Sequence, residues 1–338
     1  MAIIFSKSSG ANDDLWNEWS KQLVAVMQDT DNEKNNDEQV LNAMFNIKKS
    51  KKFGEKAAGM TEFADFEIVG EGEDGVQDEV SEGYSKLLTH SQFLKTFVCT
   101  AEMAEDGQVD VMKTKAANFI RSYKRSRLQF ATDSLTGAYA ATFAYGKKEG
   151  LDCTTGDGKP LFSTAHPTFK YKDTRSYDQC NVFTNALGSD TKMLNRLAGI
   201  GRNFKNDSDN VMGYNFDTII IPGNCYEMED TIKKIIGSDG EIGTNNNDIN
   251  TQRGKWKLVV NHLWQVEDGK NPYIIMSSDA NKELIGNVFY DRINLTMKDE
   301  ILVPSHNLRW SGRARFSCGY YNWRQVILGG ADTGVTLS

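Results

Sequence analysis

The stretch that decides the fold is VDVMKTKAANFIRSYKRSRLQFATDSLTGAYAATFAY, residues 109–145. Apolar side chains recur along it at intervals of mostly three or four residues, at Val109, Met112, Ala116, Phe119/Ile120, Tyr123 and Phe130/Ala131. This spacing lays one apolar stripe along an α-helix, and no proline interrupts it. We therefore expect one long amphipathic helix over about residues 108–145.

The predicted helix and the segment before it carry opposite charges. Between residues 113 and 127 there is no acidic residue, and the basic residues are Lys113, Lys115, Arg121, Lys124, Arg125 and Arg127. Residues 62–82 contain no Lys or Arg, and their acidic residues are Glu62, Asp65, Glu67, Glu71, Glu73, Asp74, Asp78, Glu79 and Glu82. The two stretches could pair within one chain or between chains. We expect pairing between chains, with Glu71, Glu73, Asp74, Asp78 and Glu79 on the acidic side, because complementary potentials set register as copies associate.

Two other interpretations of these charges stay open. The basic face could contact DNA phosphates without reading bases, and the acidic segment could be a solvated loop. The net charge of -7 argues against a protein whose whole surface grips nucleic acid, although a local basic strip is compatible with it.

Composition excludes several classes of protein. The chain has 338 residues, enough for one large domain or two, and 39% of them are hydrophobic. It contains no apolar run long enough for a membrane span, so we expect no membrane association. Its five cysteines are widely spaced and include no C-x-x-C pair, which predicts reduced thiols in a cytoplasm. The four histidines have no metal-ligand spacing, and we expect no cofactor.

The N-terminal region, residues 1–60, reads as small pieces with no core of their own. Leu15 to Val26 has the pattern of a helix that contains Trp16 and Trp19, residues 29–38 read as a polar linker, and residues 40–47 read as a short helix. We expect both tryptophans to dock on a surface rather than stay in water. That surface is either the chain's own body or a neighbouring subunit.

Residues 61–100 predict an extended hairpin. Residues 61–68 alternate imperfectly, residues 70–75 form a Gly-rich turn, and residues 91–100 read as the returning strand. A hairpin with an acidic middle and few large apolar residues is not stable in isolation, so it needs a partner surface.

The rest of the chain predicts a second, α/β unit and closing strands. Residues 216–222 read as an apolar strand, 224–236 as a helix, and 255–264, 273–277 and 284–290 as further strands. Residues 309–318 and 320–328 form two more strand patterns that could close a sheet against the long helix, and a short polar tail follows.

Two motifs and the order of parts indicate a family. The segment Asp157-Gly-Lys-Pro-Leu-Phe-Ser-Thr-Ala-His-Pro167 resembles the D-G-x-P-[FL]-F-x-T-x-H-P signature of Mu-like major head subunits. The segment Arg313-Ala-Arg-Phe-Ser-Cys-Gly-Tyr-Tyr-Asn-Trp-Arg324 is similar to their R-x-R-F-G-x-G-x-x-x-W-R ending, with Ser317-Cys318-Gly319 in place of G-A-G. The chain thus resembles the major capsid proteins of tailed bacteriophages, which have the fold named after phage Hong Kong ninety-seven.

The resemblance implies an α+β fold with named parts. Residues 1–60 would be the N-arm, 61–100 the E-loop that reaches over a neighbouring subunit, and 101–215 the peripheral (P) domain with its spine helix. Residues 216–304 would be the axial (A) domain, and 305–338 closing P-domain strands and a tail. The inter-subunit contacts expected for this architecture would involve the acidic and basic residues above, together with Trp16 and Trp19.

The implied function is structural. Many copies, as hexamers and pentamers, would form the icosahedral head of a phage particle around double-stranded DNA, after assembly in the bacterial host cytoplasm. The expected partners are a separate scaffolding protein, a portal, a possible decoration protein and nonspecifically contacted DNA.

Two alternatives remain. One is an encapsulin-type bacterial compartment with the same fold. The other is a cytoplasmic hydrolase, for which His166 and Asp157 would be the acid/base pair beside Ser163; Ser163 lies in no G-x-S-x-G elbow, so we expect a structural loop histidine and no enzyme.

Overall fold

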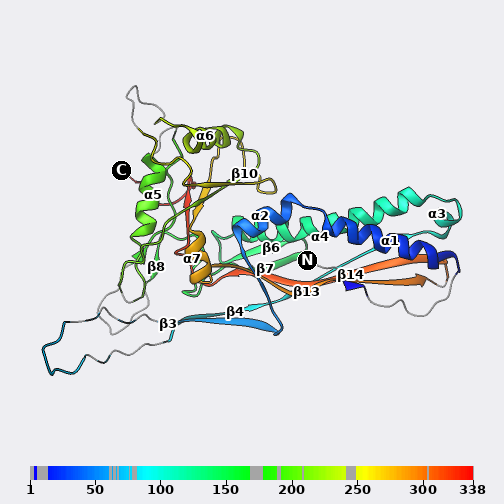
Figure 1. The fold of residues 1–338 in the computed structure, drawn as a ribbon, viewed down its shortest axis with the longest axis horizontal. Helices are drawn as coiled ribbons and strands as arrows, with labels where there is room; N and C mark the ends of the chain where they lie inside the picture. The colour runs from blue at the N-terminus through cyan, green and yellow to red at the C-terminus, as the bar shows by residue number, and fades with distance from the viewer. Residues whose placement is uncertain are drawn as a thin grey trace.

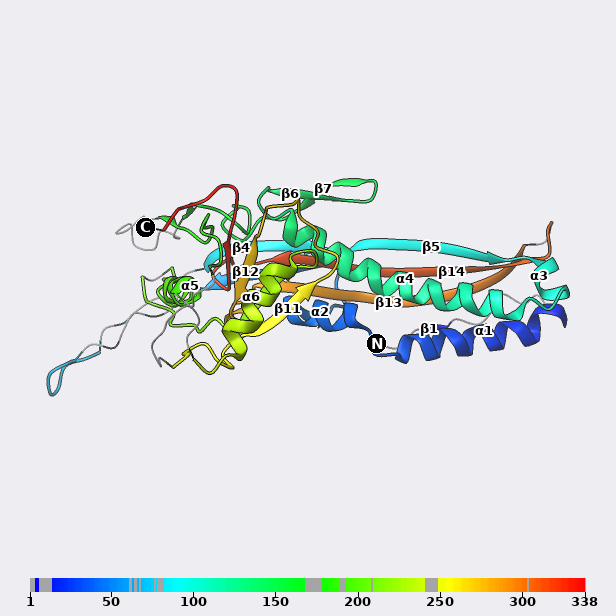
Figure 2. The same ribbon diagram turned by 90° about the horizontal axis from the view of Figure 1, so that it is seen from above.

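The computed structural model describes residues 4–5, 14–60, 63, 66, 68–75, 77, 82–167, 178–188, 192–207, 209–240, 249–302 and 304–337. These residues form an elongated molecule (Figures 1 and 2). Two long helices lie along a sheet of long strands, a second α/β unit stands at one end, and a hairpin extends past that unit. The mixture of helix and sheet confirms the α+β expectation.

Seven helices lie within the described residues, and three of them begin at a residue whose side chain satisfies a free backbone N–H. They are α1 Asp14–Asn32, α2 Asn36–Met44, α3 Ala101–Glu105, α4 Val109–Thr136, α5 Lys192–Arg202, α6 Tyr226–Gly237 and α7 Ser278–Glu283. Asn35, Thr100 and Ser277 cap the N-termini of α2, α3 and α7 by accepting a hydrogen bond from a backbone N–H.

The strands fall into two main sheets and three short pairs. They are β1 Ile4–Phe5, β2 Asn46–Lys49, β3 Gly54–Met60, β4 Glu82–Thr89, β5 Ser91–Cys99, β6 Thr142–Tyr145, β7 Lys148–Asp152, β8 His166–Pro167, β9 Asp178–Gln179, β10 Thr218–Pro222, β11 Lys257–Asn261, β12 Tyr273–Met276, β13 Asn287–Leu302, β14 Asn307–Tyr320 and β15 Val326–Gly329. The short pairs are β3–β4, β6–β7 and β8–β9.

The long sheet has the order β1-β13-β14-β5, with β2 also paired to β13. Helix α4 packs on this sheet through aromatic side chains, and Phe93 of β5 stacks on Phe316 of β14 with ring centroids 3.8 Å apart. Gly312 of β14 lets α4 approach, because a Cβ there would lie 2.7 Å from the Phe119 ring. The apolar stripe predicted along the helix therefore does form its buried face, with Met112, Ala116 and Ile120 fully enclosed.

The second sheet has the order β11-β10-β12-β15 and forms the core of the α/β unit. Every residue of β10, β12 and β15 is buried, as expected for strands covered on both faces. Strand β15 contradicts the prediction that residues 320–328 close the long sheet, because it pairs with β12 instead. Residues 287–302 were expected in the α/β unit, but β13 belongs to the long sheet.

The spine helix is shorter than predicted. Helix α4 ends at Thr136, and residues 142–145 form β6 rather than a last helical turn. Gly137 lies so close to β6 that a Cβ there would lie 2.8 Å from the Cβ of Phe143. By contrast α1 continues to Asn32, into the first four residues of the segment 29–38 that was predicted as linker.

The extended hairpin also differs from its prediction. Its two strands are β3 and β4, whereas the expected returning strand, residues 91–99, is β5 of the long sheet. Phe93 and Phe97 therefore face α4 and are not apolar ends of the hairpin. In Figure 1 the hairpin runs beneath the α/β unit towards the end of the molecule opposite α3.

Candidate inter-subunit interface

Lys124 lies inside the subunit. Its side chain is 2% exposed, and its Nζ donates to the backbone oxygens of Thr30 (3.2 Å), Asp31 (2.6 Å) and Glu33 (3.2 Å). These carbonyls lie at the C-terminal end of α1, where backbone acceptors lack helical partners and cations are favoured. Its assignment to an inter-subunit surface is therefore wrong: it fastens α1 to α4.

Arg127 is a second buried cation, and it too was assigned to the interface. Its Nη2 lies 3.0 and 2.8 Å from the two carboxylate oxygens of Asp291 on β13, and its Nη1 lies 3.8 Å from Glu38. Burial raises the pKa of Asp291, and the adjacent Arg127 opposes that shift. This ion pair links α4 to the long sheet within one chain, so the interface assignment of Arg127 is wrong.

The N-terminal arm docks on its own body. Trp16 is 2% exposed, and its Nε1 donates to the backbone oxygen of His306, 2.8 Å away. Trp19 is half-buried against the same core. Of the two surfaces expected for these tryptophans, the structure selects the subunit itself, and the interface assignment of Trp16 is corrected accordingly.

The remaining basic residues of α4 stay at the surface. Lys115, Arg121 and Arg125 are exposed and Lys113 is half-buried. Arg121 lies 3.4 Å from Glu33 of the same chain, and the Lys115 Nζ lies 3.5 Å from the Val98 oxygen. The expected part of these four residues in contacts between chains stays a prediction.

The acidic tip, which we define as Phe66 and residues 68–75, is exposed. Glu71, Glu73 and Asp74 all face solvent, and the Gly70 N–H donates to Glu73 across the turn. Asp78 and Glu79 lie outside the described residues. The side chains of Phe66 and Ile68 are fully exposed, which is unusual for two large apolar groups so close together.

A groove of about 610 Å³ opens between α4, β5 and the β6–β7 hairpin. Its lining includes a group of aromatic side chains, Phe93, Phe119, Phe130, Tyr145 and Phe316. Lys95, Lys147 and Lys148, all exposed, stand at its rim. Residues of the β13–β14 hairpin complete the lining. Because these four segments are distant in sequence, periodicity along the chain could not reveal the groove. The one local sequence feature that could have pointed to its basic rim is the Gly146-Lys147-Lys148 turn between β6 and β7.

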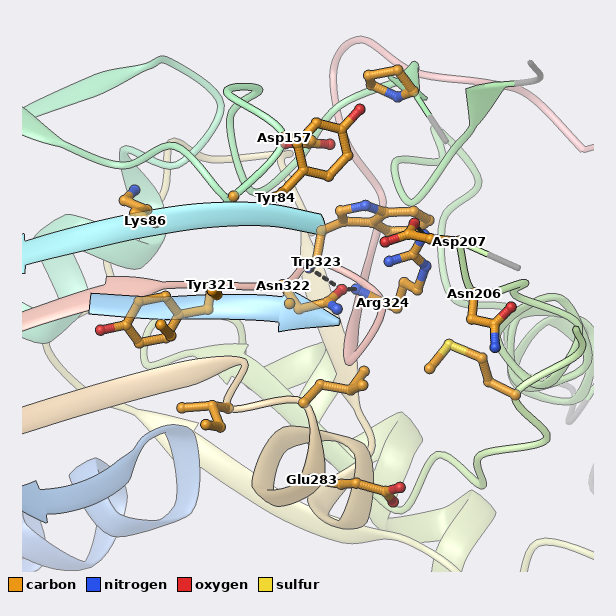
Figure 3. Close-up of a pocket in the computed structure, with 18 residues that line it drawn as sticks. Tyr84, Lys86, Asp157, Asn206, Asp207, Glu283, Tyr321, Asn322, Trp323 and Arg324 are labelled. Atoms are coloured by element: carbon orange, nitrogen blue, oxygen red, sulfur yellow. Dashed lines mark hydrogen bonds and ion pairs between the residues drawn. The ribbon is translucent and has the colours of Figure 1, made fainter. Parts of the chain in front are cut away.

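The two motif segments meet beside the β3–β4 ladder, near Gly59 and Tyr84. His166 Nδ1 lies 2.7 Å from Asp157 Oδ2, and the His166 ring stacks on Trp323 with centroids 4.3 Å apart. Arg324 binds Asp207 at 2.8 Å. Figure 3 shows Tyr84 of β4 beside Asp157 at the wall of a cavity of about 270 Å³ whose lining also includes Trp323 and Arg324.

This geometry favours a structural role for the His166–Asp157 pair. Both side chains are almost fully buried, at 0% and 3% exposed. Burial alone would raise the pKa of Asp157, but hydrogen bonds from His166 and Thr155 hold it below its ordinary value. The Ser163 hydroxyl donates to the Ala165 backbone oxygen rather than to the imidazole. The arrangement of a hydrolytic triad is therefore not formed by these three residues.

Two properties of the described residues bear on other functions. No helix among them is long and apolar enough to cross a bilayer. Within the same part of the chain, no three His, Cys, Asp or Glu side chains gather as a metal site would require.

Comparisons with known proteins identify the fold. No protein-family profile and no curated protein sequence matches the chain. Among solved structures, one from Mycobacterium phage Patience matches with a TM-score of 0.51 and 11% identity over 97% of this chain and 92% of that one. The capsid of a native GTA particle matches with a TM-score of 0.53 and 8% identity over 88% and 90%. A structure from Microbacterium phage Oxtober96 matches with a TM-score of 0.50 and 10% identity over 86% and 89%.

These similarities confirm the fold expected from the two motifs, that of Hong Kong ninety-seven-type capsid subunits. Each match covers most of both chains, so the likeness extends over the whole architecture rather than one unit.

Proposed function

We propose that this chain is the major capsid protein of a tailed bacteriophage, many copies of which form the icosahedral head around packaged double-stranded DNA. The observation that carries the proposal is the acidic tip. It presents Phe66 and Ile68 to solvent at the end of a hairpin that extends away from α4 (Figure 2). A single chain gains nothing from such a tip, whereas a neighbouring copy can cover it.

The groove on α4 and β5 offers the complementary surface. Its aromatic floor suits Phe66 and Ile68, and its lysine rim suits Glu71, Glu73 and Asp74. In Figure 2 the tip lies at one end of the molecule and the β6–β7 hairpin lies near its middle. The groove would therefore receive the tip of another copy. Lys95, Lys147 and Lys148 thus replace Lys124 and Arg127 as the basic side of the contact.

Magnitudes indicate that the apolar part dominates each contact. Burying one Phe or Ile side chain contributes about 1.5–3 kcal/mol, while an exposed ion pair contributes about 0–1 kcal/mol. The charges would mainly set register and association rate. The strength of the shell would come from repeating the contact in every subunit.

The other partners follow from the same proposal. A separate scaffolding protein, a portal and a possible decoration protein would act during head assembly in the host cytoplasm. The exposed residues of α4, Lys115, Arg121 and Arg125, could touch DNA phosphates nonspecifically. The chain would carry no catalytic activity.

Negative-stain electron microscopy of the expressed chain, with and without a co-expressed scaffolding protein, tests the function. We expect closed shells of uniform curvature. A compact monomer under every protein concentration, salt and scaffold condition would contradict the proposal. Shells that enclose a specific protein cargo and never nucleic acid would favour an encapsulin-type compartment instead.

A further inference from the structure

Both strands of the β3–β4 hairpin join the body at one place. Ser50 lies between β2 and β3, and His90 is the one residue between β4 and β5. The hairpin ladder begins immediately beyond them, at the Gly54–Thr89 pair. A change in the direction of the hairpin must therefore pass through residues 50–53 and His90.

The His90 ring connects both sides of this hinge to the long sheet. Its Nε2 lies 3.0 Å from the Ser50 Oγ, and its Nδ1 lies 2.9 Å from the Ser317 Oγ of β14. Ser50 Oγ donates its own proton to Glu55 Oε1, 2.8 Å away. It must then accept from Nε2–H, which leaves Nδ1 of a neutral ring to accept from the Ser317 hydroxyl.

Protonation would disturb this arrangement at two points. Nδ1 would become a donor, so the buried Ser317 hydroxyl would have to turn its proton elsewhere. The new charge would also lie near Arg315 of β14 and Arg292 of β13, with Glu55 of β3 opposing them. Lys52, whose Nζ lies 3.7 Å from Glu55, weakens that opposition. The Tyr290 ring lies in a T-shaped arrangement with the imidazole, with ring centroids 6.2 Å apart.

Side-chain contacts of β3 and β4 beyond the hinge also attach the hairpin to the body. Leu88 of β4 packs with Val288 and Tyr290 in a small apolar cluster that is separate from the main core. Polar contacts supplement this cluster: Lys86 lies 2.9 Å from Asp152, and the Tyr321 hydroxyl donates to the Glu55 backbone oxygen. These contacts lie along the ladder, whereas His90 holds the point where the hairpin meets the long sheet.

We propose that neutral His90 is a latch that fixes the direction of the β3–β4 hairpin, and that protonation of His90 in mild acid releases it. The latch is a property of the single chain and goes beyond the proposed function. Its physiological use would be to let the hairpin change its angle without unfolding the sheet.

The direction of the pH effect follows from linkage. Burial, and then the charge of Arg315, lower the pKa of His90 in the latched state below its ordinary value. The released state therefore binds the proton more tightly. Acidification from about pH 6.5 downward shifts the equilibrium towards release.

Hydrogen exchange measured by mass spectrometry on the full chain tests the latch. The exchange rates of peptides covering β3 and β4 are compared between wild type and His90→Gln at the same pH, so that the intrinsic rate cancels. We expect the ratio of wild-type to variant rates to rise about threefold or more between about pH 7.5 and about pH 5.5. Peptides of β14 should show no such change.

His306→Asn is the matched control, because it removes an exposed imidazole elsewhere and Asn tolerates the positive φ of 52° at this position. It should keep the wild-type pH response. If His90→Gln does not fold, Ser317→Ala replaces it, and its pH response should be smaller than that of wild type. A ratio that does not change with pH, or a response lost equally in His306→Asn, would overturn the latch. Neither result depends on whether shells form.

Discussion

Arg127 and Asp291 show how a charged residue on a helix can be part of a core. The Arg127 side chain is 1% exposed and Asp291 is 5% exposed, and the guanidinium also lies over the Phe289 ring at 5.1 Å. The charge pattern of residues 113–127 could not separate Arg127 from Arg125, since both are basic and two residues apart. The apolar period does separate them, because Arg127 lies four residues after Tyr123 and four before Ala131 on the buried stripe, whereas Arg125 lies on the other face.

Arg127→Leu should destabilise the monomer by about 3–5 kcal/mol, because it leaves the Asp291 carboxylate buried without its cation. Urea denaturation measures the loss. Arg125→Leu, at the exposed neighbouring position, should change stability by about 0.5 kcal/mol or less. The double variant Arg127→Leu/Asp291→Leu should recover much of the loss. Equal costs for the two arginines would contradict the assigned burial.

Asp157→Asn tests the pair that joins the two motifs. Because hydrogen bonds hold the pKa of the Asp157 carboxyl below its ordinary value of about 3.9, its stabilisation is present above that pH and is lost as the pH falls below it. We expect a loss of about 1.5–3 kcal/mol at neutral pH that shrinks between about pH 5 and about pH 3. Urea midpoints across this range measure it, and a pH-independent loss would contradict the pKa direction.

At the scale of elements, periodicity predicted which segments are helical or extended but not how the strands pair. The sequence pattern of residues 91–99 suits a hairpin strand and a sheet strand equally. The structure distinguishes the two, because Phe93 packs against Phe130 of α4 and Phe97 packs against Trp310 of β14. Similarly, the polar composition of residues 29–32 favours a linker, yet Lys124 accommodates the end of α1 there.

Lys124→Met should loosen α1 without unfolding the sheet. The carbonyls of Thr30, Asp31 and Glu33 would lose their shared donor, so backbone amides in the last turn of α1 should exchange about tenfold faster or more. Hydrogen exchange by mass spectrometry measures this. Lys115→Met, which removes an exposed lysine from the same helix, is the control. Unchanged protection in Lys124→Met would show that packing alone holds the helix.

At the scale of the whole molecule, the order of parts and two short motifs predicted the fold correctly. They could not predict the groove, because its walls come together only after α4, β5 and the β6–β7 hairpin have packed. The run of acidic residues in the sequence predicted the acidic side of the proposed contact. The predicted basic side included Lys124 and Arg127, which are buried inside the subunit.

Salt should weaken early assembly. The screening length falls from about 10 Å at 0.1 M to about 3 Å at 1 M ionic strength, so the charges that guide the tip to the groove would act over shorter distances. Light scattering should record slower shell formation as salt increases, with little change in monomer stability. Faster assembly in high salt would indicate that apolar burial alone controls the encounter.

Charge reversal at the tip, Glu71→Lys/Glu73→Lys/Asp74→Lys, should impair assembly while the monomer stays folded by circular dichroism. The matched reversal at exposed acids of the α3 region, Glu102→Lys/Glu105→Lys/Asp106→Lys, should assemble nearly as well as wild type. Equal defects in both variants would point to net charge rather than to the tip.

The most direct test of the claim that sister molecules complete each other's surface combines the tip reversal with Lys95→Glu/Lys147→Glu/Lys148→Glu in one chain. Sedimentation velocity compares particle yield for the tip variant, the groove variant and the combination. The account predicts low yield for each alone and recovery of most of the wild-type yield when both are reversed. A combined variant that assembles no better than either parent would contradict it.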